Sequence, residues 1–304
     1  MCLWNLNQKL IKMNPFQEEY ATDIDDKSLI EKSLKGDKAA LEDLLKKHQP
    51  YTYNIAWKMM QMPDDAQDIT QEVMVKVITN LSKFRGESQF RTWLYRIVTN
   101  HFLQMQKKKR ETLVNEDFAG FSERLSGIED IPITSIEQEE RATEINELKI
   151  ACMSGMLLCL TREQRLVYIL GEMFNADHSI GAEILDITKA NFRVRLSRAR
   201  KDIQQFMANQ CGWVKESNPC RCHKKITVAF NGGPLDSRNL LFNRSEYANF
   251  QTHIAKDTQE THDLVEEKVQ ALHSELPFKD KFDKKGFLDD FIKDERISTL
   301  FNLN

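Results

Sequence analysis

The stretch FRGESQFRTWLYRIVTNHFLQMQKKKR, residues 84–110, is the segment from which the rest of the chain can be interpreted. Gly86 and Ser88 interrupt any helix near its start, and Ser88 is a candidate N-cap. Eight basic residues and one acidic residue lie between positions 83 and 110. Such a one-signed helix favours contact with nucleic acid, although a solvated basic face is an equally good interpretation of the pattern alone. The apolar residues recur at the spacing of one helix face: Phe90, Trp93, Leu94, Ile97 and Val98.

The segment FRGESQFRTWLYRIVTN resembles the second conserved region of the extracytoplasmic-function sigma factors, a branch of the bacterial sigma-seventy class. In that family a loop and a helix melt and read the minus-ten promoter element. The resemblance implies that Asn100 lines a pocket for a flipped base and that the terminal cations hold phosphate. The minus-ten contacts expected from it are Phe84, Arg85, Arg96, Asn100, Lys107, Lys108, Lys109 and Arg110.

The preceding segment, residues 65–81, has a second helical pattern. Its apolar stripe recurs every four residues, and three polar side chains fall outside it: Asp68, Gln71 and Glu72. Solvated charge is the default interpretation of such residues. The resemblance implies a sharper one, because the matching segment of sigma factors docks on the coiled-coil helices of the largest subunit of RNA polymerase. An acidic and amide surface suits an Arg-rich partner helix.

A helix-turn-helix is predicted within SIGAEILDITKANFRVRLSRARKDI, residues 179–203. Thr188 is a natural N-cap for its second helix, and Arg193 is the first choice for a bidentate contact with guanine. This segment resembles the sigma-factor domain that binds the minus-thirty-five element. It departs from the family at Gly181-Ala182 and at the bulky Phe192. The residues expected to contact DNA are Lys189, Asn191, Arg193, Arg195, Ser197, Arg198, Arg200 and Lys201.

The composition is that of a helix-rich globular protein, with 41% hydrophobic residues, 29% charged residues and a net charge of −3 among 304 residues. No run of 18 apolar residues occurs, so we expect a cytoplasmic protein without membrane insertion. Six cysteines in such a chain are expected to be reduced. No Walker motif and no nucleophile–base arrangement is evident, so neither an enzyme nor a cofactor is expected.

The cysteines near the end of the predicted helix-turn-helix domain raise the question of a metal. Cys211, Cys220, Cys222 and His223 are weak candidates for zinc ligands, since adjacent Cys222 and His223 fit poorly with two separated pairs of ligands. Free thiols are the preferred interpretation.

The predicted fold is all-α. We expect an N-terminal extension (1–24), a region 2 type domain (25–110), a flexible acidic linker (111–145), a region 4 type helix-turn-helix domain (146–210) and a C-terminal extension (211–304). The linker is either an ordinary solvated spacer or an acidic tether that occupies a channel built for RNA. Helix is expected to resume after Ser135.

The resemblance makes the chain an RNA polymerase sigma factor for transcription initiation, with core RNA polymerase and promoter DNA as partners and an anti-sigma factor as a third that it allows. One rival is a helix-turn-helix regulator that binds duplex DNA as a dimer without polymerase. Another is a zinc or redox sensor built on the Cys-rich tail.

Overall fold

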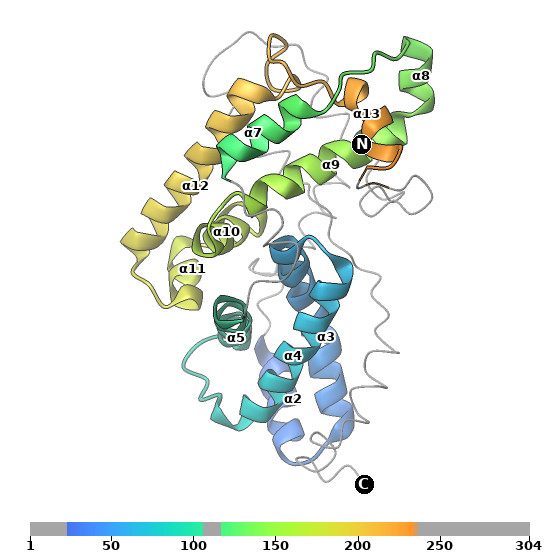
Figure 1. The fold of residues 1–304 in the computed structure, drawn as a ribbon. Coiled ribbons are helices and arrows are strands. Elements are labelled where there is room, and N and C mark those ends of the chain that lie inside the picture. Colours follow the sequence, from blue (N-terminus) through green and yellow to red (C-terminus); the bar gives the residue numbers. More distant parts are fainter. Residues whose placement is uncertain (1–22, 106–116, 234, 236–304) are drawn as a thin grey trace, which may run out of the picture. The chain divides into compact units, whose positions relative to one another are not determined.

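The computed structural model describes residues 23–105, 117–233 and 235, whose regular elements are all helices (Figure 1). Within these residues the one β pairing is an isolated bridge between Cys211 and Cys220. The predicted all-α fold class is therefore confirmed. No helix of the described residues is long and apolar enough to cross a membrane.

The described residues fall into two compact units. The first contains 23–105 and 169–194, and the second contains 117–168 and 195–233, so that α12 (Lys189–Gln210) begins in one and ends in the other. The first unit includes α11 (His178–Leu185), which the sequence assigned to a later domain. The domain boundaries given above stay a prediction.

The first unit is built on a helical bundle. Its elements are α2 (Asp23–Leu34), α3 (Lys38–Met60), α4 (Pro63–Asn80), the 3-10 turn η2 (Leu81–Lys83), α5 (Phe90–Gln104), the π-helical η3 (Ile169–Met173), α11 and the first turns of α12. In Figure 1 α2, α3 and α4 lie side by side, and α3 packs against both α2 and α4. Trp57 and Tyr95 are buried in this core.

Helix α3 differs from the sequence prediction, which placed separate helices before and after Pro50. The structure has one helix of 23 residues with Pro50 inside it. Proline removes one backbone donor from a helix, and burial compensates for this loss here. Every residue from His48 to Met60 is buried, so this half of α3 is enclosed on all faces by the neighbouring helices.

The loop before α5 also differs in detail. Ser88 is not the N-cap, because α5 begins at Phe90 and Gln89 occupies the capping position with extended backbone. Ser88 instead donates to the Gln89 carbonyl at 3.4 Å. Phe90 is buried, and its ring lies 5.1 Å from that of His48. Packing of Phe90 into the core thus sets the start of the helix one residue later than the capping pattern indicated.

A buried polar cluster joins α2 to α3. Asp26 accepts from Lys47 Nζ at 2.6 Å and lies 3.0 Å from His48 Nε2. Burial raises the pKa of Asp26, but the hydrogen bonds and charges of His48 and Lys47 outweigh it and leave that pKa lowered. Burial also lowers the pKa of His48, against the opposing effect of Asp26.

Acid is expected to destabilise the first unit. Both folded pKa values lie below their unfolded values, so the unfolded chain binds protons that the folded chain does not. Stability is full above about pH 6.5, the unfolded pKa of histidine, and falls as pH drops through the folded pKa values of His48 and then Asp26. Denaturant unfolding at several pH values measures this loss.

The variant Asp26→Asn separates this cluster from general acid effects. It is expected to lower the free energy of unfolding at pH 7 by about 1–3 kcal/mol, since the carboxylate partner of two donors is removed. It should also flatten the dependence of stability on pH. The exposed Asp43 on α3 provides a matched control, Asp43→Asn. An Asp26→Asn variant with the pH slope of the wild type would contradict the assignment.

The second unit contains α7 (Phe118–Gly127), α8 (Ser135–Glu140), α9 (Ala142–Leu158), α10 (Arg162–Tyr168), the rest of α12 and α13 (Cys222–Phe230). Helix α8 starts at Ser135 as predicted, and the capping box at Thr161 and Gln164 is confirmed by reciprocal hydrogen bonds of 3.1 and 3.2 Å. Helix α13 packs along α9 (Figure 1).

The predicted flexible linker is wrong in part, because it contains α7. Asp117 caps this helix by accepting from the Gly120 amide at 2.9 Å. Phe121 is buried, with its ring 5.3 Å from Phe206 and in contact distance of Gly155. The acidic composition hid this helix, since a single buried aromatic residue anchors it to α9 and α12.

Candidate nucleic-acid interface

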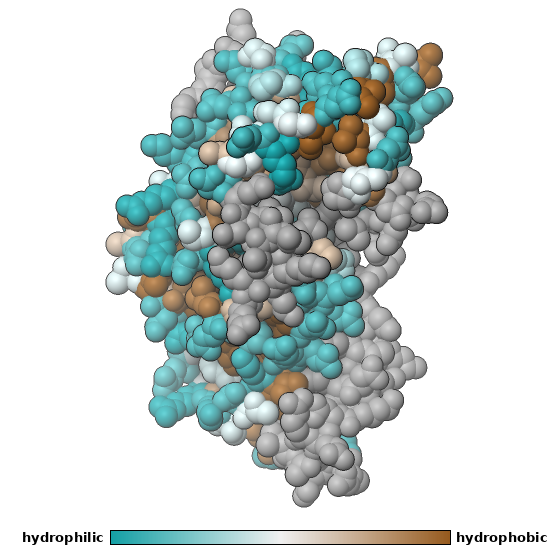
Figure 2. Space-filling view, viewed as in Figure 1, coloured by the Kyte–Doolittle hydropathy of each residue, from teal (hydrophilic) through white to brown (hydrophobic). Residues whose placement is uncertain are grey.

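Helix α4 presents the polar surface that the sequence predicted. Asp68, Gln71 and Glu72 are exposed, while the opposite stripe of Ile69, Val73 and Val77 is buried. Hydrophilic side chains also cover most of the described surface in the view of Figure 2. The separation follows from the four-residue spacing of the apolar positions, which turns every other face of α4 to solvent.

Glu72 belongs to a small chain of polar contacts between α4 and α5. Lys76 Nζ lies 2.6 Å from His101 Nδ1, and His101 Nε2 lies 3.3 Å from a Glu72 oxygen. Because an ammonium only donates, Nδ1 accepts and Nε2 donates to the carboxylate. Glu72 keeps 60% of its side chain exposed, so it is held in position yet open to a partner.

The loop between η2 and α5 packs back on its own helix. The Phe84 ring lies 5.4 Å from both Phe90 and Trp93, and Phe84 is half-buried. Gly86 has φ +72°, a conformation that favours glycine, and lets the loop reverse. Arg85 points to solvent with 82% of its side chain exposed. The loop thus combines an anchored ring with an exposed cation.

Two of the predicted minus-ten residues lie on α5 in different settings. Asn100 is exposed. Arg96 donates from Nε at 3.1 Å and from Nη2 at 2.5 Å to the Glu183 carbonyl of α11. That carbonyl lies in the last turn of α11, where a cation is favoured by unpaired carbonyls and the helix dipole. The sequence gave no indication of this contact, since 87 positions separate its two residues.

The predicted phosphate contacts Lys107, Lys108, Lys109 and Arg110 lie outside the described residues.

Helices α11 and α12 form the predicted helix-turn-helix. The turn is made by Asp186, a left-handed C-cap with φ +53°, and by Thr188, whose Oγ1 accepts from the Asn191 amide at 3.2 Å. Thr188 is thus confirmed as the N-cap of α12. The Phe192 ring is buried against Gly181, where a β-carbon would lie only 2.5 Å from it. Both departures from the family pattern therefore meet in one close contact.

The exposed face of α12 is strongly basic. Arg193 donates from Nε to His178 Nδ1 at 3.3 Å, and Lys189 donates to Ser179 Oγ at 2.6 Å. Both contacts tie the start of α12 to the start of α11 without covering the side chains. Buried residues of α12 are Phe192, Leu196, Ala199 and Ile203, which is the stripe predicted from the sequence. Exposed polar residues are Lys189, Asn191, Arg193, Ser197, Arg198 and Lys201, and Arg195 and Arg200 are half-buried.

The weak zinc candidates are only partly brought together. Cys211, Cys220 and Cys222 line one pocket, and Cys152 of α9, which the sequence had not connected with them, lines it too. His223 does not belong to that lining. In the part of the chain that the structure describes, no three His, Cys, Asp or Glu side chains are arranged to hold a metal ion.

Comparison with known proteins supports the interpretation of the first unit. Residues 33–112 match the family described as Sigma-70 region 2. RNA polymerase sigma-H factor of Pseudomonas aeruginosa is 29% identical over 186 residues, which cover 60% of this chain and 93% of that protein. ECF RNA polymerase sigma factor SigW of Bacillus subtilis is 27% identical over 180 residues, covering 59% and 95%. ECF RNA polymerase sigma-E factor of Haemophilus influenzae is 26% identical over 189 residues, covering 60% and 96%.

Proposed function

We propose that this chain, a sigma factor of the extracytoplasmic-function type within the sigma-seventy class, binds core RNA polymerase and directs it to promoters. The observation that carries the proposal is the region 2 match at residues 33–112, which contains both the polar face of α4 and the whole of α5. The relatives are similar over more than this region and bear the names of RNA polymerase sigma factors. The chain would act in the cytoplasm by binding alone, without covalent chemistry.

Core polymerase would dock on the exposed face of α4. Asp68 and Glu72 supply carboxylates and Gln71 supplies an amide, all within two turns of one helix. Carboxylates of this kind form strong hydrogen bonds with guanidinium groups of a partner helix. The contact between Glu72 and His101 fixes the carboxylate before docking, which reduces the entropy lost on binding.

Promoter melting would use the loop and the exposed side of α5. Stacking of a base on an aromatic ring contributes about 1–3 kcal/mol, comparable with the few kcal/mol needed to unstack a base. Phe84 is half-exposed and rests on two other rings, so it offers a firm platform. Arg96 is engaged with α11, so its DNA contact would require exchange of the Glu183 carbonyl for phosphate.

Replacement of Asn100 by alanine is expected to impair DNA opening more than closed-complex binding. The exposed amide can both donate and accept at a base edge, and a base edge is free only after the strands separate. Permanganate reactivity of unpaired thymines would fall by about tenfold or more, corresponding to roughly 1–3 kcal/mol for one base contact. The adjacent exposed Leu103→Ala is the control. Unchanged melting in Asn100→Ala would contradict this role.

The minus-thirty-five element would be read by the first turns of α12. Arg193→Ala is expected to lower the affinity for the preferred duplex by about 5- to 150-fold, equivalent to roughly 1–3 kcal/mol, and to reduce discrimination at one base pair. Lys201→Ala should weaken specific and non-specific duplexes alike, since a phosphate contact has no sequence preference. Fluorescence anisotropy with matched and mismatched duplexes separates the two outcomes.

The ratio of specific to non-specific affinity is the decisive readout for Arg193. Loss of its hydrogen bond with His178 would weaken all duplexes through the helix-turn-helix and would leave that ratio unchanged. An unchanged ratio would therefore assign Arg193 a structural role.

Transcription with purified core polymerase tests the whole proposal. The full-length chain should direct initiation from a subset of promoters in a genomic library and should produce an open bubble around the minus-ten element. A stand-alone helix-turn-helix regulator would bind duplexes as a dimer and give no initiation. Failure to initiate at any promoter, with core polymerase that is active with another sigma factor, would refute the proposal.

A further inference from the structure

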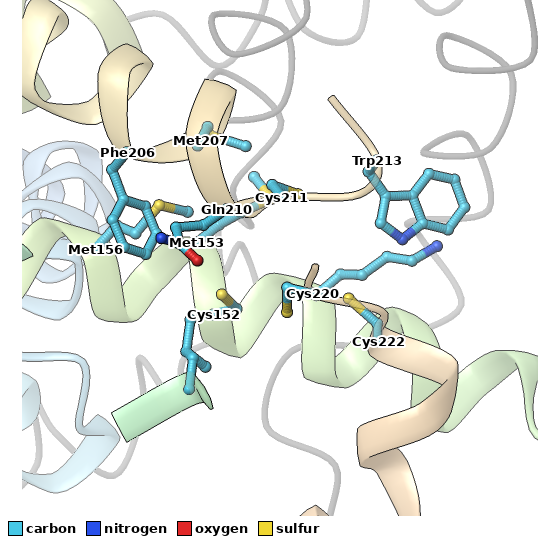
Figure 3. A pocket seen from close by; sticks show the side chains of 12 residues that line it. Cys152, Met153, Met156, Phe206, Met207, Gln210, Cys211, Trp213, Cys220 and Cys222 are labelled. Atoms are coloured by element: carbon cyan, nitrogen blue, oxygen red, sulfur yellow. The ribbon is translucent and has the colours of Figure 1, made fainter. Parts of the chain in front are cut away.

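A pocket in the second unit gathers four thiols from separate elements (Figure 3). Cys152 comes from α9, Cys211 follows the end of α12, and Cys222 is the first residue of α13, with Cys220 two residues before it. In Figure 3 the four side chains point toward the same space. All four are free thiols and all are partly exposed.

Cys211 and Cys220 are paired by the backbone. The Cys220 amide donates to the Gln210 carbonyl and the Gly212 amide donates to the Cys220 carbonyl, both at 3.1 Å, so Cys220 lies opposite Cys211 in a parallel bridge. Paired strands lie about 4.7–4.9 Å apart. That spacing falls within the range of about 4.4–6.8 Å between the α-carbons of disulfides.

The loop that brings them together is held at several points. Asn218 donates from its amide to the carbonyls of Ala208 and Cys211 at 2.8 and 3.0 Å, closing the end of α12. Arg221 donates to the carbonyl of Asn218 at 2.5 Å. Gly212 is required beside them, because a β-carbon there would overlap the Arg221 side chain and the Cys220 carbonyl. The pairing of Cys211 and Cys220 is therefore set before any bond forms.

We propose that Cys211 and Cys220 are a site of reversible oxidation, at which a low-molecular-weight disulfide converts the two thiols into an intramolecular disulfide. The bond would tie the C-terminal end of α12 to the residues that lead into α13. Because the opposite end of α12 carries Arg193, the modification would act on the helix that the proposed function uses to read DNA.

The reaction balances without any further oxidant. Cys211 loses its proton and attacks one sulfur of the small disulfide, which releases one small thiolate and leaves a mixed disulfide on Cys211. Cys220 then loses its proton and attacks the Cys211 sulfur, which releases the second small thiolate. Two protein thiols are oxidised, one small disulfide is reduced, and the two protons end on the released thiols.

The surroundings favour Cys211 and Cys220 over their neighbours. Burial raises the pKa of Cys222 to about 12 and that of Cys152 well above its ordinary value. Burial also raises the pKa of Cys211, but backbone amides of Trp213 and Val214 and the charge of Lys149 oppose it. Since the thiolate is the nucleophile, Cys211 is the thiol better placed to start the exchange.

Peptide mapping after oxidation tests the site with unusual clarity, since trypsin separates the cysteines. Cleavage after lysine and arginine places Cys211 in 202–215, Cys220 in 216–221, Cys222 in 222–224 and Cys152 in 150–162. The full-length native protein is incubated with oxidised glutathione and the remaining thiols are alkylated. The expected result is one cross-linked species, 202–215 joined to 216–221, which dithiothreitol abolishes.

Variants and a denatured sample complete the test. Cys211→Ser and Cys220→Ser should each abolish the cross-link, whereas Cys152→Ser and Cys222→Ser should retain it. Denatured wild-type protein should give a mixture of pairings among its six cysteines. A glutathione adduct that persists on Cys211, a cross-link to 222–224 or 150–162, or no oxidation at all would overturn the proposal. No polymerase or DNA is present, so the outcome is independent of the proposed function.

Discussion

Replacing Asp68 and Glu72 together by lysine is expected to abolish transcription directed by this chain, through loss of binding to core polymerase. Both carboxylates lie on the exposed face of α4, within two turns of one another. Reversal of two charges opposite a basic partner helix places like charges together, which costs several kcal/mol. We expect the affinity for core polymerase to fall by about 30- to 1,000-fold, equivalent to roughly 2–4 kcal/mol.

Surface plasmon resonance with immobilised core polymerase measures this change. Glu31→Lys on α2 is the matched control, since Glu31 is exposed on the same unit and reverses the same charge. The double variant should unfold at nearly the wild-type temperature, because the one ion pair lost, from Glu72 to His101, is largely exposed. Normal affinity in the folded double variant would show that polymerase binds elsewhere.

Gly181→Ala is expected to disrupt the helix-turn-helix. A β-carbon at this position would lie 2.5 Å from two atoms of the Phe192 ring. Phe192 is fully buried, so the ring has no free space into which it could turn. Overpacking of this kind is expected to lower the free energy of unfolding by about 2–3 kcal/mol. Duplex binding should weaken as well, because α12 must shift relative to α11.

A paired substitution identifies the ring as the cause. Phe192→Leu removes the atoms that the new methyl group would meet, so the double variant should be less destabilised than the sum of the two single variants. Gly127→Ala at the end of α7 is the control, since a β-carbon there meets nothing within 4 Å. Denaturant unfolding of the four proteins gives the coupling free energy. Strict additivity would exclude the clash as the source.

The contact between Arg96 and α11 connects the two DNA-reading elements of the first unit. Arg96 was predicted to contact the minus-ten element, and here it closes the last turn of α11. One guanidinium cannot serve the carbonyl and a phosphate at once with the same donors. Under the proposed function, DNA binding by α5 therefore requires that α11 be released from Arg96.

The amino-acid sequence by itself determined the features that depend on neighbours along one helix. The stripe on α4, the buried stripe on α12, the N-cap at Thr188 and the capping box at Thr161 follow from local spacing, and the structure confirms each. The exposure of Asp68 and Glu72 followed in the same way, because burial of one helix face leaves the other in solvent.

Tertiary structure alone decided the features that depend on the path of the chain. The sequence pattern could not pair Arg96 with Glu183, place Phe192 against Gly181, bring Cys152 to the other three thiols or order α7 through Phe121. Each of these contacts joins residues of different elements, whose approach is set by the packing of whole helices. Local periodicity carries no information on that packing, because it states which face of a helix is buried and not what buries it.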